Sequence, residues 1–408
     1  MASHGVPRGP RTRTDEQKRL DSEKIQKYHE LEEQIRSSPT YDESVFQNTT
    51  KLLRLNPEYY TPPGSPSSAA PLSTSQTATS MSSSGASFVS SSAATLSNSP
   101  STKTDSQTPF TSGADKDGDG LEEQRRKDAD VLVSELHFTI PLLLEFPKCY
   151  WIWSYRLWVL EQAVIRLDVA RARRIWEDEL ALDSKMLTKD RRNFHAWGYR
   201  RQVIERLESK ELSLDGGKTT TSLVESEFAY TTKMIHQDLS NFSAWHNRSK
   251  LIPRLLAERN ADDLARKAFL EEELGIIREA LNVGPEDQSL WFYHQFLMLE
   301  LTEYIGRPSI VPHLSLEERM TYIARELDDI RDLLSDYDDV KWIYEALFEY
   351  TLAVAKMEER PLAENERTDV EEWLAQLRKL DPKRNGRWDD LEMEHIRGRQ
   401  PSYVQESF

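Results

Sequence analysis

Apolar side chains recur at helical spacing along most of this chain. Residues 15–36 carry a sparse apolar stripe among many charged residues, and residues 41–55 carry a second one. From residue 122 onward, amphipathic runs alternate with short breaks. Apolar residues three or four positions apart line one face of a helix, and no alternating run of useful length requires a sheet. The pattern therefore predicts an all-α fold.

Turn-forming residues mark several of the breaks between these runs. Gly, Pro and Asp are typical of helix ends and turns, so we expect a helix to end at each of these places. They are Asp183, Gly216-Gly217, Gly284-Pro285 and Asp381-Pro382.

Residues 61–114 interrupt the helical pattern. Half of these 54 residues are Ser or Thr, and only Lys103 and Asp105 are charged. Such a stretch has too little apolar surface to offset the entropy lost on ordering. We predict a helical segment with the start of a first repeat over 1–60, a disordered insert over 61–121, a helical-hairpin repeat array over 122–400 and a tail over 401–408.

The end of the insert imitates the opening of a calcium-binding EF-hand loop. It reads Asp115-Lys-Asp-Gly-Asp-Gly120, but position twelve of the loop is Arg126. A glutamate must bind the ion with both oxygens at that position. A polar linker before the next helix is therefore the favoured interpretation.

Tryptophans mark an internal repeat. The four clearest copies are spaced by 44, 48 and 46 residues, and two weaker copies follow after 51 and 46. They centre on Trp153, Trp197, Trp245, Trp291, Trp342 and Trp388. A period in the mid-forties corresponds to one helical hairpin per repeat. We therefore predict a right-handed superhelical solenoid of helical hairpins.

The residues around each tryptophan suggest a division of roles. An aromatic residue three positions earlier lies one turn away on the same face, where the pair can fill the groove between hairpins. An arginine three positions later must reach water, a carboxylate or a partner. A structural role is favoured over partner binding, and neither excludes the other. The motif or interface candidates are Tyr150, Trp153, Arg156, Phe194, Trp197, Tyr199, Arg200, Phe242, Trp245, Arg248, Trp291, Tyr293 and His294.

Charge and cysteine content narrow the possible functions. A net charge of −16 argues against a protein that binds nucleic acid through phosphate contacts. The single cysteine, Cys149, cannot form an intrachain disulfide or a thiolate-rich zinc site. No apolar stretch reaches transmembrane length, and the first residues lack the core of a secretory signal. We expect a cytoplasmic protein that binds no metal itself, with His4 a solvated side chain of a flexible tail.

The repeats resemble those of the protein prenyltransferase alpha subunits, over most of the chain outside the insert. The segments Asn193-Phe-His-Ala-Trp, Asn241-Phe-Ser-Ala-Trp and Asp287-Gln-Ser-Leu-Trp are most similar to the alpha subunit of geranylgeranyltransferase type II, the Rab enzyme. Because the chain ends soon after the sixth repeat, it resembles the compact fungal form. Two alternatives stay open: the alpha subunit shared by farnesyltransferase and geranylgeranyltransferase type I, and a helical-repeat scaffold without an enzymatic partner.

The resemblance implies half of an enzyme that is inactive alone. In the family, the alpha subunit wraps a beta subunit that bears the catalytic zinc. Geranylgeranyl diphosphate lies at the subunit seam, and the lipid passes to C-terminal cysteines of a Rab GTPase presented by an escort protein. Lys148 and His195 match the family's cationic residues near the diphosphate. Lys148 would be a fixed positive charge and His195 a hydrogen-bond donor.

One segment departs from the family pattern. Asn56-Pro-Glu-Tyr-Tyr60 looks like the opening of a first repeat, but the expected Trp and Arg are missing after it. A natural insertion and a gene-model error both account for the break. Residues 122–146 could supply the missing helix.

Overall fold

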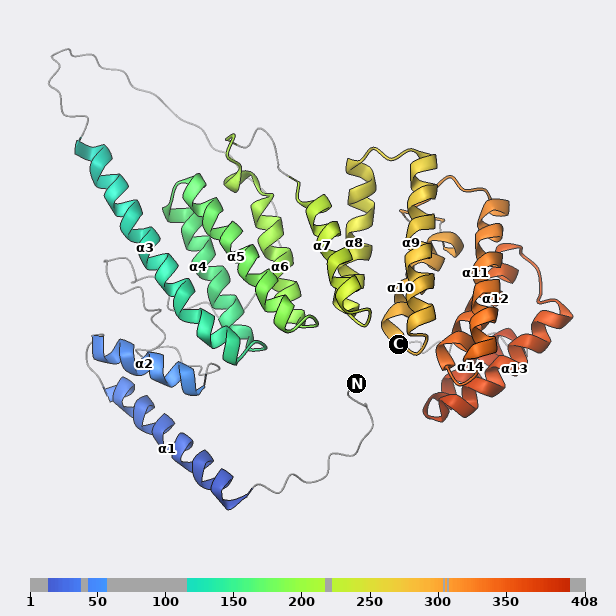
Figure 1. Cartoon of the computed structure of the whole chain (residues 1–408), viewed down its shortest axis with the longest axis horizontal. Coiled ribbons are helices and arrows are strands. Elements are labelled where there is room, and N and C mark those ends of the chain that lie inside the picture. The colour runs from blue at the N-terminus through green and yellow to red at the C-terminus, as the bar shows by residue number, and fades with distance from the viewer. Residues whose placement is uncertain are drawn as a thin grey trace, which may run out of the picture. The chain divides into compact units, whose positions relative to one another are not determined.

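The computed structural model describes residues 14–37, 43–56, 116–216, 222–303, 305–306 and 308–396. Within these ranges the chain forms fourteen α-helices and no strand, which confirms the predicted all-α class (Figure 1). His4, most of the predicted insert and the 401–408 tail lie outside the described residues.

The helices follow one another along the chain, and most are joined by short connections from α3 onward. Their bounds are α1 (Asp15–Ser37), α2 (Glu43–Leu55), α3 (Lys116–Glu145), α4 (Tyr150–Arg166), α5 (Val169–Lys189), α6 (Phe194–Leu207), α7 (Val224–Gln237), α8 (Phe242–Glu258), α9 (Asp263–Val283), α10 (Gln288–Thr302), α11 (Leu316–Asp336), α12 (Lys341–Met357), α13 (Glu364–Leu380) and α14 (Asn385–His395). Two single turns of 3₁₀-helix, Lys210–Leu212 and Pro382–Arg384, lie in the connections.

The first two helices pair through a small apolar cluster of their own. Leu31 and Ile35 of α1 are buried against Leu52 of α2, with Tyr28 and Leu55 at the edge. This is the second half of the apolar stripe that the sequence predicts for residues 15–36. The first half of α1 instead exposes its apolar side chains to solvent.

The remaining helices form six hairpins, from α3–α4 to α13–α14. The second helix of each hairpin carries the tryptophan motif, or its counterpart, near its first turn. The hairpins divide between two compact units. Unit 1 takes the described residues up to 186 together with 198–216, and unit 2 takes 187–197 together with the described residues from 222. Helices α5 and α6 cross the division between the two units.

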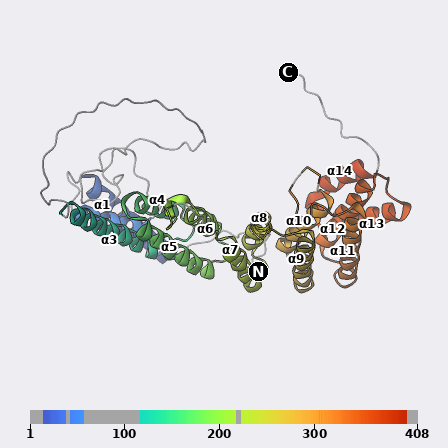
Figure 2. The same ribbon diagram turned by 90° about the horizontal axis from the view of Figure 1, so that it is seen from above.

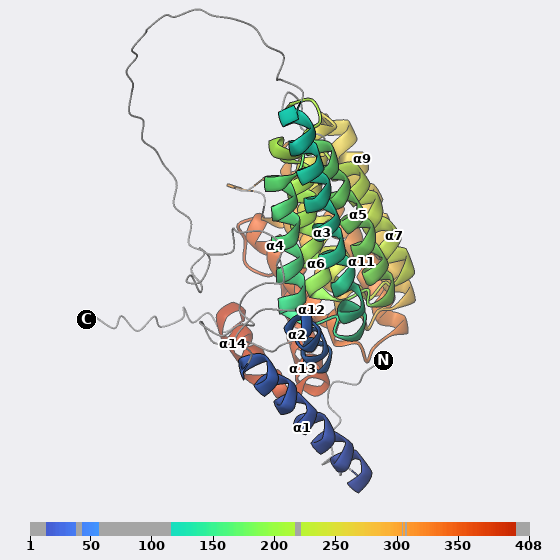
Figure 3. The same ribbon diagram turned by 90° about the vertical axis from the view of Figure 1, so that its left-hand side faces the viewer.

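Each unit is built from neighbouring helices that pack along their lengths. In unit 1, α3 packs against α4, and Figure 3 shows α3, α4 and α5 side by side. In unit 2, α10 packs against both α8 and α12. Seen from above in Figure 2, α8, α10 and α12 form one layer of unit 2, while α7, α9 and α11 form the other. The second helices therefore share one layer, which brings equivalent turns of the hairpins to one edge of this unit.

Two predicted element boundaries were wrong. Helix α5 runs without a break through Asp183, because this side chain is only 1% exposed and pairs with Arg200 at 3.4 Å. Helix α3 begins at Lys116, inside the range predicted as insert. The described part of the EF-hand-like sequence is therefore helical, and a helix cannot wrap oxygens around a calcium ion as that loop does. The favoured linker interpretation also placed the start of the helix too late.

The weaker repeat copy was centred on the wrong residue. Trp342 is only half-buried, whereas Tyr344 is 5% exposed and donates its hydroxyl to the Asp338 carbonyl at 2.8 Å. That carbonyl lies six residues earlier, as it does for the tryptophans of the clearest copies. Tyr344 therefore takes the buried role in this hairpin, and Trp342 packs edge-on against Phe292.

Candidate functional site

Two buried arginines clamp successive helices with the same geometry. In unit 1, Arg156 of α4 donates to both carboxylate oxygens of Glu179 on α5, at 2.7 and 2.5 Å. In unit 2, Arg248 of α8 donates to both oxygens of Glu273 on α9, at 2.8 and 2.6 Å. Both guanidinium groups also bond to the first helix of their own hairpin, through the Leu136 carbonyl in one case and threonine hydroxyls in the other. Each clamp therefore ties one hairpin to the next.

The charges in these clamps depend on one another. Burial alone would lower the pKa of Arg156 and Arg248, but the facing glutamates outweigh it and raise the pKa of both. The guanidinium groups are thus locked in their charged form. Removing one partner of such a pair would leave a buried charge without compensation.

A tyrosine from the following second helix completes each clamp. Tyr199 Oη donates to Glu179 at 2.7 Å, and Tyr293 Oη donates to Glu273 at 2.5 Å. Burial and then the glutamate charge raise the pKa of both tyrosines well above its ordinary value, so both stay neutral donors. In each clamp the tyrosine follows the glutamate by 20 positions.

The tyrosine–glutamate pair recurs in the α3–α4 hairpin, but without an arginine. Tyr155 Oη donates to Glu135 at 2.9 Å, again 20 positions apart. In the complete clamps the arginine precedes its glutamate by 23 and 25 residues, and at that distance before Glu135 the sequence has no arginine. Among the described residues, Tyr155 is the one group that bonds to this 7%-exposed carboxylate. Burial raises the pKa of Glu135, and the tyrosine hydrogen bond only partly opposes it.

The other two copies vary the clamp. His294 occupies the arginine position, is 1% exposed, and places its ring nitrogens 2.9 Å from Tyr350 Oη and 3.2 Å from Glu326. Arg200 is 4% exposed and donates to the Ser184 hydroxyl at 2.9 Å. The arginine heads were predicted to reach water, a carboxylate or a partner. Arg156 and Arg248 bond to buried carboxylates of this chain, and Arg200 bonds to the Ser184 hydroxyl.

Each buried tryptophan anchors the turn that precedes its helix. The indole N–H of Trp153 donates to the Pro147 carbonyl at 2.9 Å, six residues earlier. The same bond is made at 2.8, 2.8 and 2.6 Å in the next three hairpins, by Trp197, Trp245 and Trp291. The rings are at most 4% exposed. The tryptophan therefore fixes both the hairpin core and the path of the turn between its two helices.

The anchored turns carry the two residues predicted to handle a diphosphate. Lys148 follows the Pro147 carbonyl directly and is exposed. His195 is half-buried in the first turn of α6, with its ring centroid 4.0 Å from that of Phe194. The buried Asn193 side chain caps this helix by accepting from the backbone N–H groups of His195 and Ala196, at 3.1 and 3.4 Å. Lys148 belongs to unit 1 and His195 to unit 2, so each turn is described by itself.

The aromatic residues three positions before the tryptophans do not fill the groove between hairpins, so this prediction was wrong. Tyr150, Phe194 and Phe242 are 58%, 68% and 49% exposed. Each is the first residue of its helix. Side chains on a helix lean toward its N-terminus, so a side chain at the first position extends past the helix end. In unit 2, Phe242 also packs edge-on against the 41%-exposed Phe292. The hairpin turns therefore present exposed aromatic rings beside their polar residues.

Comparison with known proteins agrees with the hairpin boundaries. The family model described as "Protein prenyltransferase alpha subunit repeat" matches residues 132–163, 176–207 and 224–255. The matched segments cover most of the helix pairs α3–α4, α5–α6 and α7–α8. Each segment ends inside a second helix that carries a buried tryptophan.

Three relatives named "Geranylgeranyl transferase type-2 subunit alpha" are similar to this chain. The Schizosaccharomyces pombe protein is 29% identical over 53% of this chain and 61% of its own length. The Candida albicans protein is 27% identical over 95% and 96%. The Dictyostelium discoideum protein is 32% identical over 64% and 70%. The chain belongs to the protein prenyltransferase alpha subunit family. It spans about three fifths of the S. pombe relative and nearly all of the C. albicans one.

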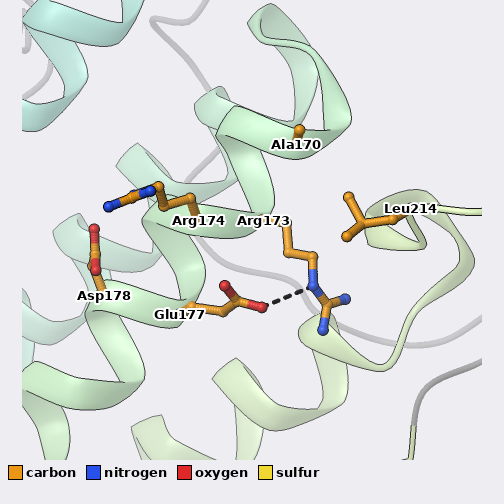
Figure 4. Close-up of a pocket in the computed structure, with 6 residues that line it drawn as sticks. All are labelled: Ala170, Arg173, Arg174, Glu177, Asp178 and Leu214. Atoms are coloured by element: carbon orange, nitrogen blue, oxygen red, sulfur yellow. Dashed lines mark hydrogen bonds and ion pairs between the residues drawn. The ribbon is translucent and has the colours of Figure 1, made fainter.

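One surface pocket of the described residues is a poor candidate for an active site, because the arginine in its wall already bonds to groups of this chain. It has a volume of about 420 Å³ and lies beside α5 and Leu214 (Figure 4). Arg173 in its wall is held by Glu177 at 2.8 Å and by two backbone carbonyls. Within the described ranges no three His, Cys, Asp or Glu side chains gather as a metal site. None of the described helices is long and apolar enough to cross a bilayer.

Sequence reasoning missed the buried glutamates that the tyrosines, and in two cases also arginines, bond to. Glu179, Glu273 and Glu135 each lie 20 residues before the tyrosine that bonds to them. This repeated Glu-to-Tyr spacing is visible in the sequence and was the available signal. The turn-capping residues Asn193 and Asn241 were also missed as a group, although both stand four positions before a tryptophan.

Proposed function

We propose that this chain is the alpha subunit of a type-2 geranylgeranyl transferase. The observation that carries the proposal is the similarity to the C. albicans protein of that name, which extends over 95% of this chain. The S. pombe and D. discoideum relatives carry the same name. The proposal includes a zinc-bearing beta subunit as the partner, and a cytoplasmic site of action that suits a chain with one cysteine.

The reaction joins a cysteine sulfur to a lipid carbon. The thiolate of a Rab GTPase, presented by an escort protein, attacks the first carbon of geranylgeranyl diphosphate. The carbon–oxygen bond breaks, and the diphosphate leaves with the electron pair. Zinc on the beta subunit would activate the thiolate, and this chain would supply positive charge to the departing diphosphate.

The turns of the hairpins support this division of labour. Lys148 is exposed on an anchored turn, so its ammonium group can act as a fixed charge on the leaving group. His195 stands in the first turn of α6, where the helix dipole also favours an anion. The exposed rings of Tyr150, Phe194 and Phe242 would pack against the beta subunit.

A substrate comparison tests the proposed function. The chain is purified together with the beta subunit encoded in the same organism and supplied with labelled geranylgeranyl diphosphate. We expect lipid transfer to a Rab that ends in two cysteines, in the presence of escort protein. Preferential transfer to a peptide ending in Cys-aliphatic-aliphatic-X would instead identify the subunit shared by the other prenyltransferases. Failure to recover any such beta subunit would favour a scaffold.

A matched pair of lysine variants tests the role of Lys148. Lys383 stands five positions before Trp388, as Lys148 stands five positions before Trp153, and it is also exposed. We expect Lys148→Ala to lower kcat/KM by about 10- to 100-fold, because a charge-assisted hydrogen bond contributes about 1.5–3 kcal/mol. Lys383→Ala should leave turnover unchanged. Normal kinetics for Lys148→Ala would remove this residue from the proposed mechanism.

A further inference from the structure

We infer that Trp153 is a positioning residue for Lys148, an inference that rests on the proposed function. Its indole N–H holds the turn that carries the lysine, and this turn lacks the side-chain helix cap found in the next three hairpins. Loss of that one hydrogen bond should therefore impair diphosphate handling through Lys148.

The bond acts directly beside the lysine. Trp153 Nε1 donates to the Pro147 carbonyl at 2.9 Å, and Lys148 is the next residue. The carbonyl and the Lys148 N–H belong to one planar peptide unit. Fixing the carbonyl therefore fixes the direction in which the lysine backbone leaves the turn.

The indole is itself held rigidly. Trp153 is 4% exposed, and its ring lies 4.9 Å from the ring of Tyr199, centroid to centroid. Tyr199 bonds to Glu179, which holds Arg156, one turn after Trp153 on the same helix. The buried clamp thus fixes the helix from which the indole reaches back to the turn.

The turns of the next three hairpins have a second support, a side-chain helix cap, that this turn lacks. In three other hairpins the residue four positions before the tryptophan caps the helix with its side chain. The capping bonds are 3.1 Å from Asn193 to the His195 N–H, 3.2 Å from Asn241 to the Ala244 N–H and 2.8 Å from Asp287 to the Ser289 N–H. Here that position is Cys149, which makes no side-chain capping bond. The indole bond and a backbone bond from the Cys149 N–H to the Phe146 carbonyl, at 3.0 Å, hold this turn.

The hairpin of Trp291 provides the matched control. Its indole donates to the Pro285 carbonyl at 2.6 Å, and the residue that follows is Glu286. Trp153→Phe and Trp291→Phe both keep an aromatic ring and both delete one indole N–H. Because the Asp287 cap still supports the turn of Trp291, the two variants can lose stability to different degrees, but a purely structural role would leave the chemistry of the folded complexes alike.

The test uses the complex with the beta subunit and compares Trp153→Phe, Trp291→Phe, Lys148→Ala and Trp153→Phe/Lys148→Ala. We expect Trp153→Phe to lower kcat/KM for geranylgeranyl diphosphate by about 5- to 20-fold, since small displacements of a charged group are costly. Inhibition by inorganic diphosphate should weaken in parallel. Trp291→Phe should change either quantity less than about twofold, and Trp153→Phe should add little when Lys148 is already Ala.

The outcomes separate this inference from the proposed function. If Lys148→Ala is impaired while Trp153→Phe matches Trp291→Phe, the positioning role is wrong and the proposed function stands. If the effects of Trp153→Phe and Lys148→Ala multiply in full, the tryptophan does not act through the lysine. If Lys148→Ala has normal kinetics and diphosphate inhibition, the role of Lys148 in the proposed function fails first.

Discussion

At the scale of single residues, the most consequential interactions are charges buried in pairs. Arg248 and Glu273 are at most 2% exposed and bond through two parallel hydrogen bonds. Such pairs cost desolvation when they form, so their presence alone does not measure stability. The cost of breaking one is larger, because the remaining partner stays buried and charged.

Removing the Arg248 head should therefore destabilise the protein strongly. We expect Arg248→Met to lower the free energy of unfolding by about 3–5 kcal/mol. Arg254→Met is the control on the same helix, because Arg254 and its partner Glu258 are exposed and such pairs contribute about 0.3–0.5 kcal/mol. Denaturant unfolding of the full chain measures both. Equal losses in the two variants would contradict the clamp.

Glu135 should behave in the opposite way to Glu179. Its pKa is raised in the folded protein by burial, so the folded state binds this proton more tightly than the unfolded chain. Its contribution to stability is present below the ordinary value of 4.5 and is lost as the pH rises through the folded pKa. At pH 7 the charged, buried carboxylate therefore destabilises the folded protein, and Glu135→Gln removes that charge.

We expect Glu135→Gln to raise the unfolding midpoint at pH 7. This gain should shrink as the pH falls through the raised folded pKa of Glu135, and it should be absent below pH 4.5, where the carboxyl is protonated in both the folded and the unfolded state. Glu179→Gln should lower the midpoint at pH 7, because it leaves Arg156 without its counter-charge. Thermal unfolding over a pH series measures both. A stability loss in Glu135→Gln as large as in Glu179→Gln would show that Glu135 also has a cationic partner in the folded protein.

At the scale of helices, position within the helix decides which aromatic residues are buried. The tryptophan in the second turn points into the hairpin, while the aromatic at the first position extends past the helix end. A helical pattern alone gives both residues the same face. The exposed ring is therefore the one available to a partner.

Phe194 tests this division between core and surface. We expect Phe194→Ala to change the free energy of unfolding by less than about 0.5 kcal/mol, as for most surface substitutions. It should weaken association with the beta subunit by about tenfold or more, since aromatic residues dominate interface energies. Leu264→Ala is the control, because Leu264 is 76% exposed at the start of a first helix. An unchanged dissociation constant for Phe194→Ala would mean that the beta subunit binds to another surface of this chain.

At the scale of the whole molecule, successive hairpins hold their turns in one way and display different residues on them. Four successive hairpin turns are held by the same indole bond, and what varies is the residue displayed on the turn. Lys148, Arg192, Ser240 and Glu286 occupy one position of four successive turns. A uniform frame with different displayed residues suits a subunit that contributes a few groups to a site completed by its partner.

The chain alone should therefore be inactive. We expect no detectable geranylgeranyl transfer by the purified chain and restored transfer when the beta subunit is added. Co-expression should also raise the unfolding temperature, because binding to the folded state alone stabilises it. Transfer of radiolabelled lipid and thermal unfolding measure the two effects. Turnover by the isolated chain at the rate of the complex would overturn the assignment as a non-catalytic half.

The sequence by itself determined the helices, the repeat and the family, because helical spacing and the tryptophan register are local patterns. Its resemblance to the family also singled out Lys148 and His195 as candidates. Tertiary structure decided that Glu179 faces Arg156, that Tyr344 replaces Trp342 in the core, and that Phe194 is exposed. Burial and pairing depend on side chains 20 or more residues away, and the helical period of one segment carries no information about them.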